Sequence, residues 1–145
     1  KSLGIGVGAI EKTRIDDKTV EIRKIEGDVE GKVAYILDDE ICRGTTMGES
    51  IHKLEKRDVD AIIPVAIHGL FTKGAVENLS SPKLKKIIVT DTVPNFQNVK
   101  DQLPLEVLSV SPLISAAIKQ IHKGPGGSVS HLFAKPALKL DVVQD

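Results

Sequence analysis

The sequence has very few aromatic side chains: Trp is absent, and one Tyr and three Phe make up 3% of the 145 residues. Proteins that bind single-stranded nucleic acids stack the bases on such rings. The sequence also lacks net charge, because 20 Lys and Arg residues balance 20 Asp and Glu residues. No overall field therefore attracts nucleic acid or an acidic membrane surface. We expect no nucleic-acid partner and no membrane partner.

Cysteine and long apolar runs are scarce as well. Cys42 is the single cysteine, which excludes an internal disulfide and fits the reducing cytoplasm. No apolar run is long enough to span a bilayer, and we expect no signal peptide. Because the chain does not begin with Met, we expect it to be a piece of something longer. Its length suits one domain with a sizeable core.

Short apolar runs alternate with helical patterns along the chain. They predict strands at residues 3–10, 19–25, 33–37, 60–67, 87–90 and 105–110, and helices at about 46–57, 73–78 and 113–122. Strands separated by helices favour right-handed crossovers and a mostly parallel sheet. The predicted fold class is α/β, with a mostly parallel sheet flanked by helices.

The most informative stretch is residues 33–46, Val-Ala-Tyr-Ile-Leu-Asp-Asp-Glu-Ile-Cys-Arg-Gly-Thr-Thr. It has the pattern of a strand that ends in Asp38 and Asp39, followed by a loop that opens a helix. Loop amides and a helix N-terminus beyond a parallel strand can hold an anion. The loop suits a phosphate, and the two carboxylates suit hydroxyls or Mg²⁺. The alternative is a solvated turn in which Thr45 or Thr46 caps the helix.

Four other side chains could carry chemistry. Lys12 and Arg14 are two residues apart, so an extended backbone directs them to the same side, where two cations can stabilise a polyphosphate; ordinary surface charges are the alternative. We interpret His68 as a strand-end residue that bonds a local carbonyl. Cys42 lies near a helix N-terminus, which can lower a thiol pKa, but without an evident histidine partner we interpret it as a passive loop residue. No histidine pair has the spacing of zinc ligands.

Five separated segments occur in a fixed order. They are residues 33–46 quoted above, Ala-Ile-His-Gly-Leu-Phe at 66–71, Val-Thr-Asp-Thr-Val-Pro at 89–94, Val-Leu-Ser-Val-Ser-Pro-Leu at 107–113 and Ser-Val-Ser-His-Leu-Phe at 128–133. This series resembles the carboxyl-terminal half of ribose-phosphate pyrophosphokinase, also called phosphoribosyl pyrophosphate synthetase. The resemblance implies a type I phosphoribosyltransferase-like domain over residues 1–133, followed by a tail at 134–145 of unknown role.

The resemblance also implies a reaction. Diphosphate passes from MgATP to the C1 hydroxyl of ribose 5-phosphate, so the expected cofactor is Mg²⁺, the expected small-molecule partners are ATP and ribose 5-phosphate, and the expected assembly is a homo-oligomer. Lys12 and Arg14 match the catalytic lysine and arginine at the head of a mobile loop, here at about residues 13–28. They would stabilise the transferring group, and Arg14 would also contact ribose 5-phosphate.

The binding residues follow from the same resemblance. Asp38 and Asp39 match the acidic pair that contacts the ribose hydroxyls, and they are also the candidate metal ligands. The cradle for the 5-phosphate matches Cys42, Arg43, Gly44, Thr45 and Thr46. The family's cradle usually has the sequence Asp-Thr-Gly-Gly-Thr, so Thr45 replaces a glycine, and we expect backbone strain there if the position needs a positive φ.

Two other functions remain open at this point. The altered cradle is compatible with an inactive or weakly active homologue that binds ribose phosphates or nucleotides and regulates an active partner. A phosphoribosyltransferase that uses a nucleobase is the third interpretation, and the segments at 111–113 and 128–133 argue against it.

Overall fold

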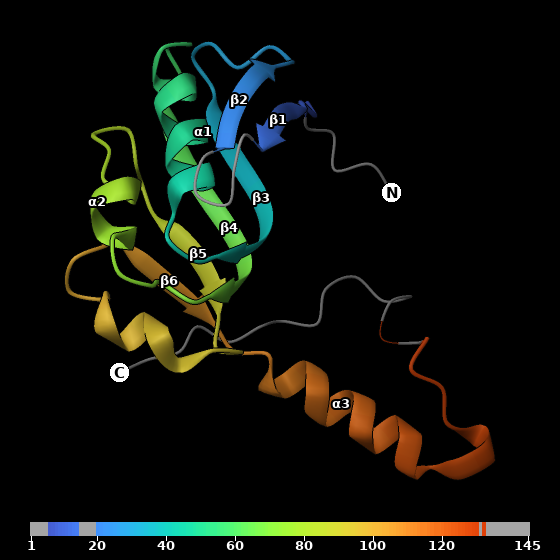
Figure 1. The fold of residues 1–145 in the computed structure, drawn as a ribbon. Helices are drawn as coiled ribbons and strands as arrows, with labels where there is room; N and C mark the ends of the chain where they lie inside the picture. Colours follow the sequence, from blue (N-terminus) through green and yellow to red (C-terminus); the bar gives the residue numbers. More distant parts are fainter. Residues whose placement is uncertain (1–5, 15–19, 131, 133–145) are drawn as a thin grey trace.

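The structure, a computed structural model, describes residues 6–14, 20–130 and 132. Figure 1 shows the order of its elements along the chain. They are β1 (Ile10–Arg14), β2 (Val20–Ile25), β3 (Val33–Ile41), α1 (Thr45–Glu55), β4 (Ala61–Gly69), α2 (Ala75–Leu79), β5 (Ile87–Thr90), the 3₁₀ helix η1 (Pro94–Asn98), β6 (Leu105–Leu108), α3 (Ser111–His122) and the 3₁₀ helix η2 (Gly124–Gly126).

The centre of the fold is a four-stranded sheet in the order β3-β4-β5-β6, in which every neighbouring pair is parallel. Helices connect β3 to β4 and β4 to β5, as parallel strands require. The predicted α/β class with a mostly parallel sheet is confirmed. The carboxyl ends of all four strands meet at one edge, which is the edge where α/β proteins bind ligands.

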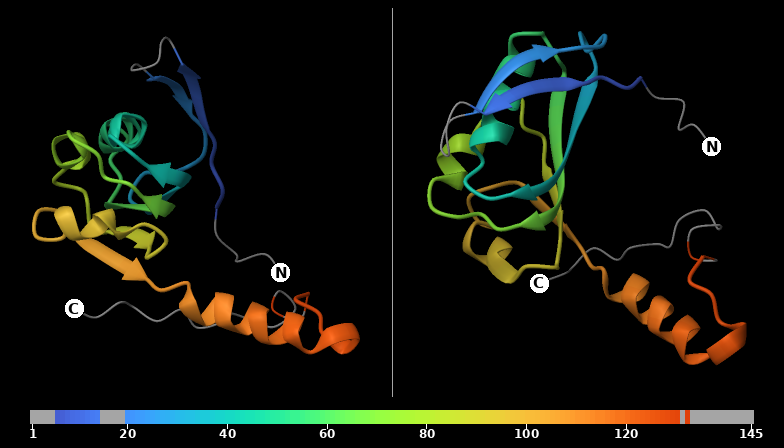
Figure 2. Two further views of the ribbon diagram at one scale, coloured as in Figure 1. Left: turned by 60° about the horizontal axis from the view of Figure 1, so that its bottom comes forward. Right: turned by 45° about the vertical axis from the view of Figure 1, so that its right-hand side comes forward.

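One face of the sheet is buried against α1 and α2 (Figure 2). Along β3 and β4 the side chains alternate, so Ile36 and Ile62 enter this core and meet Ile51 of α1, which is 2% exposed. The other face is open along β3, where Tyr35 and Leu37 keep 59% and 75% of their surface exposed. On β4 that face is partly covered, because Ile63 is only 2% exposed. The core therefore lies on the helical side of the sheet.

The amino-terminal strand differs from its prediction. Residues 6–9 have no regular structure, Val7 is 90% exposed, and strand β1 begins only at Ile10. The physical reason is pairing: β1 forms an antiparallel ladder with β2 over Ile10–Arg14, whereas Gly6 and Gly8 offer no side chain to pack. The buried strand predicted at residues 3–10 is therefore wrong for residues 6–9.

The other elements agree with the sequence patterns to within a few residues. Strand β5 has the predicted bounds, α1 starts and ends close to them, and β3 continues four residues beyond its predicted end. Several predictions fall outside the described residues: the beginning of the first strand, the centre of the loop at 13–28, His131, Phe133 and the tail. Among the described residues no helix has the length and apolar character needed to cross a membrane.

Candidate functional site

The acidic pair lies at the carboxyl edge of the parallel sheet, in the second half of β3. The Asp39 amide donates to Asp38 Oδ1 at 3.0 Å, and the Glu40 amide donates to Asp39 Oδ1 at 2.9 Å. Because neighbouring residues of a strand point to opposite faces, Asp38 and Asp39 stand on different sides of β3. Asp38 is half-buried and lines a cavity, whereas Asp39 is exposed. The pair thus places carboxylates on both sides of one strand end.

The loop after β3 turns sharply into α1 at Gly44, which has φ 72° and is the N-cap residue. A Cβ atom at this position would lie 2.9 Å from Leu79 Cγ, so glycine is required by both conformation and space. Thr45 is the first residue of the helix and has no positive φ. The expected strain at Thr45 is therefore wrong, and so is the alternative in which Thr45 or Thr46 is the cap.

The amino end of α1 has the properties of an anion site. No side chain caps it, no acidic residue lies in its first turn, and its first amides lack intrahelical acceptors, as in any helix. Arg43 is exposed directly before it. The positive end of the helix dipole, the open amides and the guanidinium group all favour a negatively charged ligand.

Cys42 begins the loop and is a hydrogen-bond donor. Its thiol donates to Glu40 Oε1 at 3.3 Å. Burial raises the pKa of the Cys42 thiol above its ordinary value, and the bond to Glu40 and the charges of Glu40 and Asp39 raise it further. The thiol is therefore protonated at neutral pH and is not an activated nucleophile. This agrees with its interpretation as a passive loop residue.

A second polar cluster occupies the same edge at the ends of β4, β5 and β6. His68 Nδ1 lies 2.9 Å from Thr92 Oγ1, so its partner is a hydroxyl group and not the carbonyl predicted from the sequence. Asp91 accepts hydrogen bonds from Ser109 Oγ at 2.6 Å and from the Val110 amide at 2.9 Å. These two bonds hold the pKa of Asp91 below its usual value. Asp91 thereby ties the end of β5 to the start of α3.

Sequence reasoning gave no role to Asp91 or to Asn78, whose side-chain amide donates to the Arg43 carbonyl at 2.7 Å. Asp91 follows directly after β5, and Asp38 likewise lies near the end of β3. A polar residue at the end of a strand was therefore the sequence signal that could have indicated Asp91. Asn78 lies on α2, 35 residues from its partner. No local pattern in the sequence indicates that contact.

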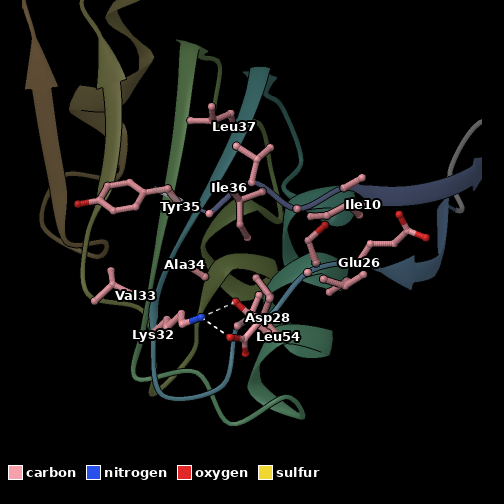
Figure 3. A pocket seen from close by; sticks show the side chains of 18 of the residues that line it. Ile10, Glu26, Asp28, Lys32, Val33, Ala34, Tyr35, Ile36, Leu37 and Leu54 are labelled. Atoms are coloured by element: carbon pink, nitrogen blue, oxygen red, sulfur yellow. Dashed lines mark hydrogen bonds and ion pairs between the residues drawn. The ribbon is translucent and has the colours of Figure 1, made fainter. Parts of the chain in front are cut away.

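A cavity of about 780 Å³ lies beside the loop, between β3, the start of β1 and α1 (Figure 3). Its walls are mostly apolar and include Ile10, Ile36 and Leu54. Asp38, Thr46 and Ser50 line it as well, so the cavity adjoins the anion site.

Lys12 and Arg14 lie on β1, with Ile22 and Val20 as their register partners on β2. A register irregularity separates Glu11 from Lys12. The side chains of Lys12 and Arg14 lie outside what the structure describes, and their catalytic roles stay predictions. The implied loop at 13–28 contains part of this hairpin, because residues 13–14 and 20–25 are strand residues.

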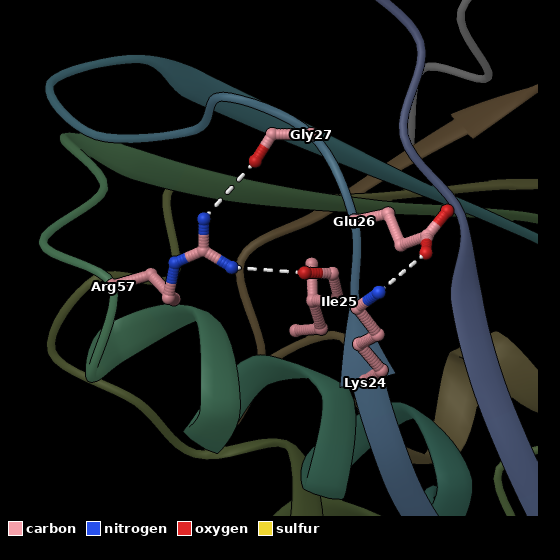
Figure 4. Close-up of polar contacts among 5 residues, drawn as sticks. All are labelled: Lys24, Ile25, Glu26, Gly27 and Arg57. Carbon is pink, nitrogen blue, oxygen red and sulfur yellow. Dashed lines mark hydrogen bonds and ion pairs between the residues drawn. The ribbon is translucent and has the colours of Figure 1, made fainter.

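The hairpin packs against α1, and Arg57, just after the end of that helix, adds two hydrogen bonds to it. Arg57 donates to the carbonyl oxygens of Ile25 at 2.9 Å and Gly27 at 3.0 Å, as Figure 4 shows. Lys24 and Glu26 form an exposed ion pair nearby at 2.7 Å. Arg57 thus holds the exit of the hairpin beside the end of α1, and the candidate anion site lies at the opposite end of that helix.

Comparison with known proteins defines the class and then the family. The phosphoribosyl synthetase-associated domain matches residues 12–134. A solved structure of phosphoribosylpyrophosphate synthetase from Mycobacterium smegmatis superimposes with a TM-score of 0.63 at 28% identity, over 74% of this chain and 35% of that one. The fold is accordingly of the phosphoribosyltransferase type.

Curated relatives agree with this class. The chain is 40% identical over 131 residues to a ribose-phosphate pyrophosphokinase of Aquifex aeolicus. The matched region covers 90% of this chain and 41% of that relative. It is 39% identical over 140 residues to a putative ribose-phosphate pyrophosphokinase of Streptomyces coelicolor, over 94% and 43% of the two chains. The chain belongs to the ribose-phosphate pyrophosphokinase family, and it spans about two-fifths of the length of these relatives.

Proposed function

We propose that the chain is a ribose-phosphate diphosphokinase domain, which acts in the transfer of diphosphate from MgATP to the C1 hydroxyl of ribose 5-phosphate. The observation that carries this proposal is the open amino end of α1 at the carboxyl edge of the sheet, with Arg43 before it and Asp38 beside it. Family membership supports the same assignment. The products are phosphoribosyl pyrophosphate and AMP.

In this proposal the loop holds the 5-phosphate and the strand end holds the sugar. The amides of Gly44, Thr45 and Thr46 bind phosphate oxygens, with Cys42 and Arg43 completing the cradle. Asp38 and Asp39 accept hydrogen bonds from the ribose hydroxyls. These contacts position the C1 hydroxyl for attack on the β-phosphorus, and the bond to the departing AMP breaks as the new bond forms.

Lys12 and Arg14 stabilise the charge that develops on the transferring diphosphate. A guanidinium group can grip two phosphate oxygens at once, and an ammonium group acts as a compact point charge. Arg14 also contacts ribose 5-phosphate. Both residues belong to the hairpin that Arg57 attaches to α1, so the hairpin can present them to the site.

Magnesium would be held together with the phosphates of ATP. No group of three or more His, Cys, Asp and Glu side chains that could hold a metal is found among the described residues. Mg²⁺ commonly needs only one or two carboxylates together with substrate phosphates, and either Asp38 or Asp39, which stand on different sides of β3, would supply one. When bound, the ion neutralises phosphate charge. ATP, ribose 5-phosphate and a second copy of the protein are the proposed partners.

The proposal is tested in the full-length protein by measuring AMP release from MgATP and ribose 5-phosphate. Lys12→Ala should lower kcat by about 10²–10³-fold, because it removes a charge that stabilises the transition state. Lys24→Ala in the same hairpin is the matched control and should change kcat little, since its exposed ion pair contributes almost nothing. Unchanged AMP release in Lys12→Ala would remove the role assigned to that lysine.

Ribose binding is tested separately. Asp38→Ala should weaken ribose 5-phosphate binding by about tenfold, as expected when a charged acceptor of hydrogen bonds is lost. Asp60→Ala at the amino end of β4 is the control and should leave affinity unchanged, because Asp60 lies outside the carboxyl edge. Equal affinities for the two variants would argue against the placement of the sugar at Asp38.

One observation favours a second candidate, a weakly active or inactive regulatory homologue. Cys42 places a protonated thiol at the first cradle position, where the family usually has an aspartate. If the full-length protein binds ribose 5-phosphate and ATP but releases no AMP, this second function replaces the first. If Cys42→Asp then restores AMP release, the cradle sequence is the cause.

A further inference from the structure

Three consecutive carbonyl groups of the candidate loop point toward the segment that runs from the end of β4 to α2. The Ile41 carbonyl accepts from the Leu70 and Phe71 amides at 3.0 Å each, and the Cys42 carbonyl accepts from the Thr72 amide at 3.0 Å. The Arg43 carbonyl accepts from Asn78 Nδ2 at 2.7 Å. Backbone amides thus hold the first two carbonyls, and a side chain holds the third.

This arrangement determines where the loop amides point. The peptide bonds of the described residues are all trans, and in a planar trans peptide the N–H points opposite to the C=O. Because the Cys42 and Arg43 carbonyls face α2 and its preceding loop, the amides of Arg43 and Gly44 face the opposite, ligand side. Successive amides oriented in this way form an anion-binding concavity.

Asn78 is itself held firmly in place. Its backbone N–H donates to the Gly74 carbonyl at 3.1 Å. Its own carbonyl oxygen packs so closely on α1 that a Cβ atom at Gly48 would collide with it. Its neighbour Leu79 is fully buried against Gly44. The side-chain amide of Asn78 therefore reaches the loop from a backbone that is held in place on both sides.

We propose that Asn78 is a positioning residue for the phosphate-binding loop: its side-chain amide fixes the Arg43–Gly44 peptide so that the Gly44 amide faces the ligand. This inference rests on the proposed function, in which the ligand is the 5-phosphate of ribose 5-phosphate. Asn78 does not touch the ligand. It acts through the peptide that does.

The first test compares Asn78→Ala and Asn78→Asp with Gln102→Ala in the full-length protein. The Asp variant keeps the shape of the side chain but cannot donate to the Arg43 carbonyl. Gln102 is a matched control, because its side-chain amide donates to the Asn98 carbonyl at 3.2 Å in the connection between η1 and β6. Hydrogen exchange over residues 43–48 should accelerate by about two- to fivefold in both Asn78 variants and stay unchanged in Gln102→Ala.

The second test is a split of kinetic constants. Both Asn78 variants should raise KM for ribose 5-phosphate about two- to fivefold. KM for ATP should stay constant, and the melting temperature should change no more than in Gln102→Ala. Wild-type behaviour of Asn78→Asp in both tests would overturn the proposal, since only the lost donor distinguishes it. A uniform change of both KM values would mean a general structural role and would overturn it as well.

The two proposals fail in different ways. If the wild-type protein does not bind ribose 5-phosphate, the proposed function is wrong, but hydrogen exchange in the absence of ligand still decides whether Asn78 orders the loop. If ribose 5-phosphate binds and exchange over residues 43–48 is the same in all variants, the proposed function stands and the role of Asn78 is wrong.

Discussion

Helices α1 and α3 have the same apolar spacing but opposite surroundings. Met47, Ile51 and Leu54 of α1 are no more than 3% exposed, and Ile114, Ile118 and Ile121 of α3, at the same i, i+4, i+7 positions, are 52–69% exposed. No residue of α3, which the structure describes in full, is buried. An apolar stripe therefore predicts a helix, but it does not predict what the helix packs against.

The cause of the difference lies in the connections. Helix α1 joins two adjacent parallel strands, so it must return across the sheet and bury its stripe there. Helix α3 follows β6, the last strand of the sheet, and projects away from it in all views (Figures 1 and 2). The loop before α1 is fixed as well, because Gly44 packs on Leu79 of the neighbouring helix α2. The candidate site is thus built where packing is tight.

The largest effect should separate the two stripes directly. Ile51→Ala should lower the free energy of unfolding by about 2–4 kcal/mol, because it leaves a cavity in the core. Ile118→Ala, the equivalent position on α3, should change it by less than about 0.5 kcal/mol. Urea denaturation of the 145-residue chain measures both. Equal losses in the two variants would mean that α3 is packed in solution and would end the comparison.

The second effect concerns glycines at the two helices. Gly48→Ala places a Cβ atom against the Asn78 carbonyl and should cost about 1–3 kcal/mol of stability as α1 and α2 separate. Gly126→Ala, in η2 beyond α3, has no atom within 4 Å of the added Cβ. It should change the unfolding free energy by less than about 0.5 kcal/mol. A Gly48→Ala protein as stable as wild type would show that the approach of the helices is not tight.

The third effect tests what holds the start of α3. Asp91 holds the start of α3, so Asp91→Asn should lower stability by about 1 kcal/mol at neutral pH. The pKa of Asp91 is lowered in the folded state, so the carboxylate stabilises the fold above its unfolded pKa, and this contribution disappears as the pH falls through the folded pKa. The two proteins should therefore converge once the pH falls below the lowered folded pKa of Asp91. Asp101→Asn, an exposed carboxylate before β6, is the control for general charge effects.

A constant difference between Asp91→Asn and wild type down to acid pH would contradict this assignment. The stability would then come from something other than the ionised carboxylate. The measurement is thermal or urea unfolding of the chain as a function of pH.

The smallest expected effect is on the alkylation rate of Cys42, in the loop before α1. The pKa of Cys42 is raised, so alkylation by iodoacetamide at neutral pH should be a few-fold slower than that of a free thiol, because only the thiolate reacts. Glu40→Gln should lower the pKa, since it removes a carboxylate that raises it. The pH profile of alkylation measures both. A profile shifted below that of a free thiol would mean that the helix dipole outweighs Glu40.

Local patterns were sufficient for most elements of the fold. The bounds of β5 and the centre of α1 follow from apolar periodicity, since both are decided by burial of their own side chains. Strand β1 was misplaced because its position depends on pairing with β2, and pairing is not visible within residues 3–10. The exposure of α3 was equally invisible, because it depends on the position of β6 in the sheet.

The candidate site also contains residues that local patterns reveal and residues that depend on distant contacts. The places of Asp38, Asp39 and the loop at a strand end and a helix start could be predicted because strand, acidic pair and helix start are contiguous in the sequence, and their binding roles stay predictions. The strain expected at Thr45 was wrong because Gly44 makes the turn instead. Asn78 and Asp91 were missed because their partners are 35 and 18–19 residues away. Contiguous chemistry can be predicted from one sequence, whereas contacts between distant elements need the fold.

The most direct measurement is a crystal structure of the full-length protein with ribose 5-phosphate bound. We expect the phosphate to contact the amides of Gly44, Thr45 and Thr46 and the ribose hydroxyls to reach Asp38 or Asp39. A phosphate bound elsewhere, with Arg43 or Thr45 filling the loop, would contradict it.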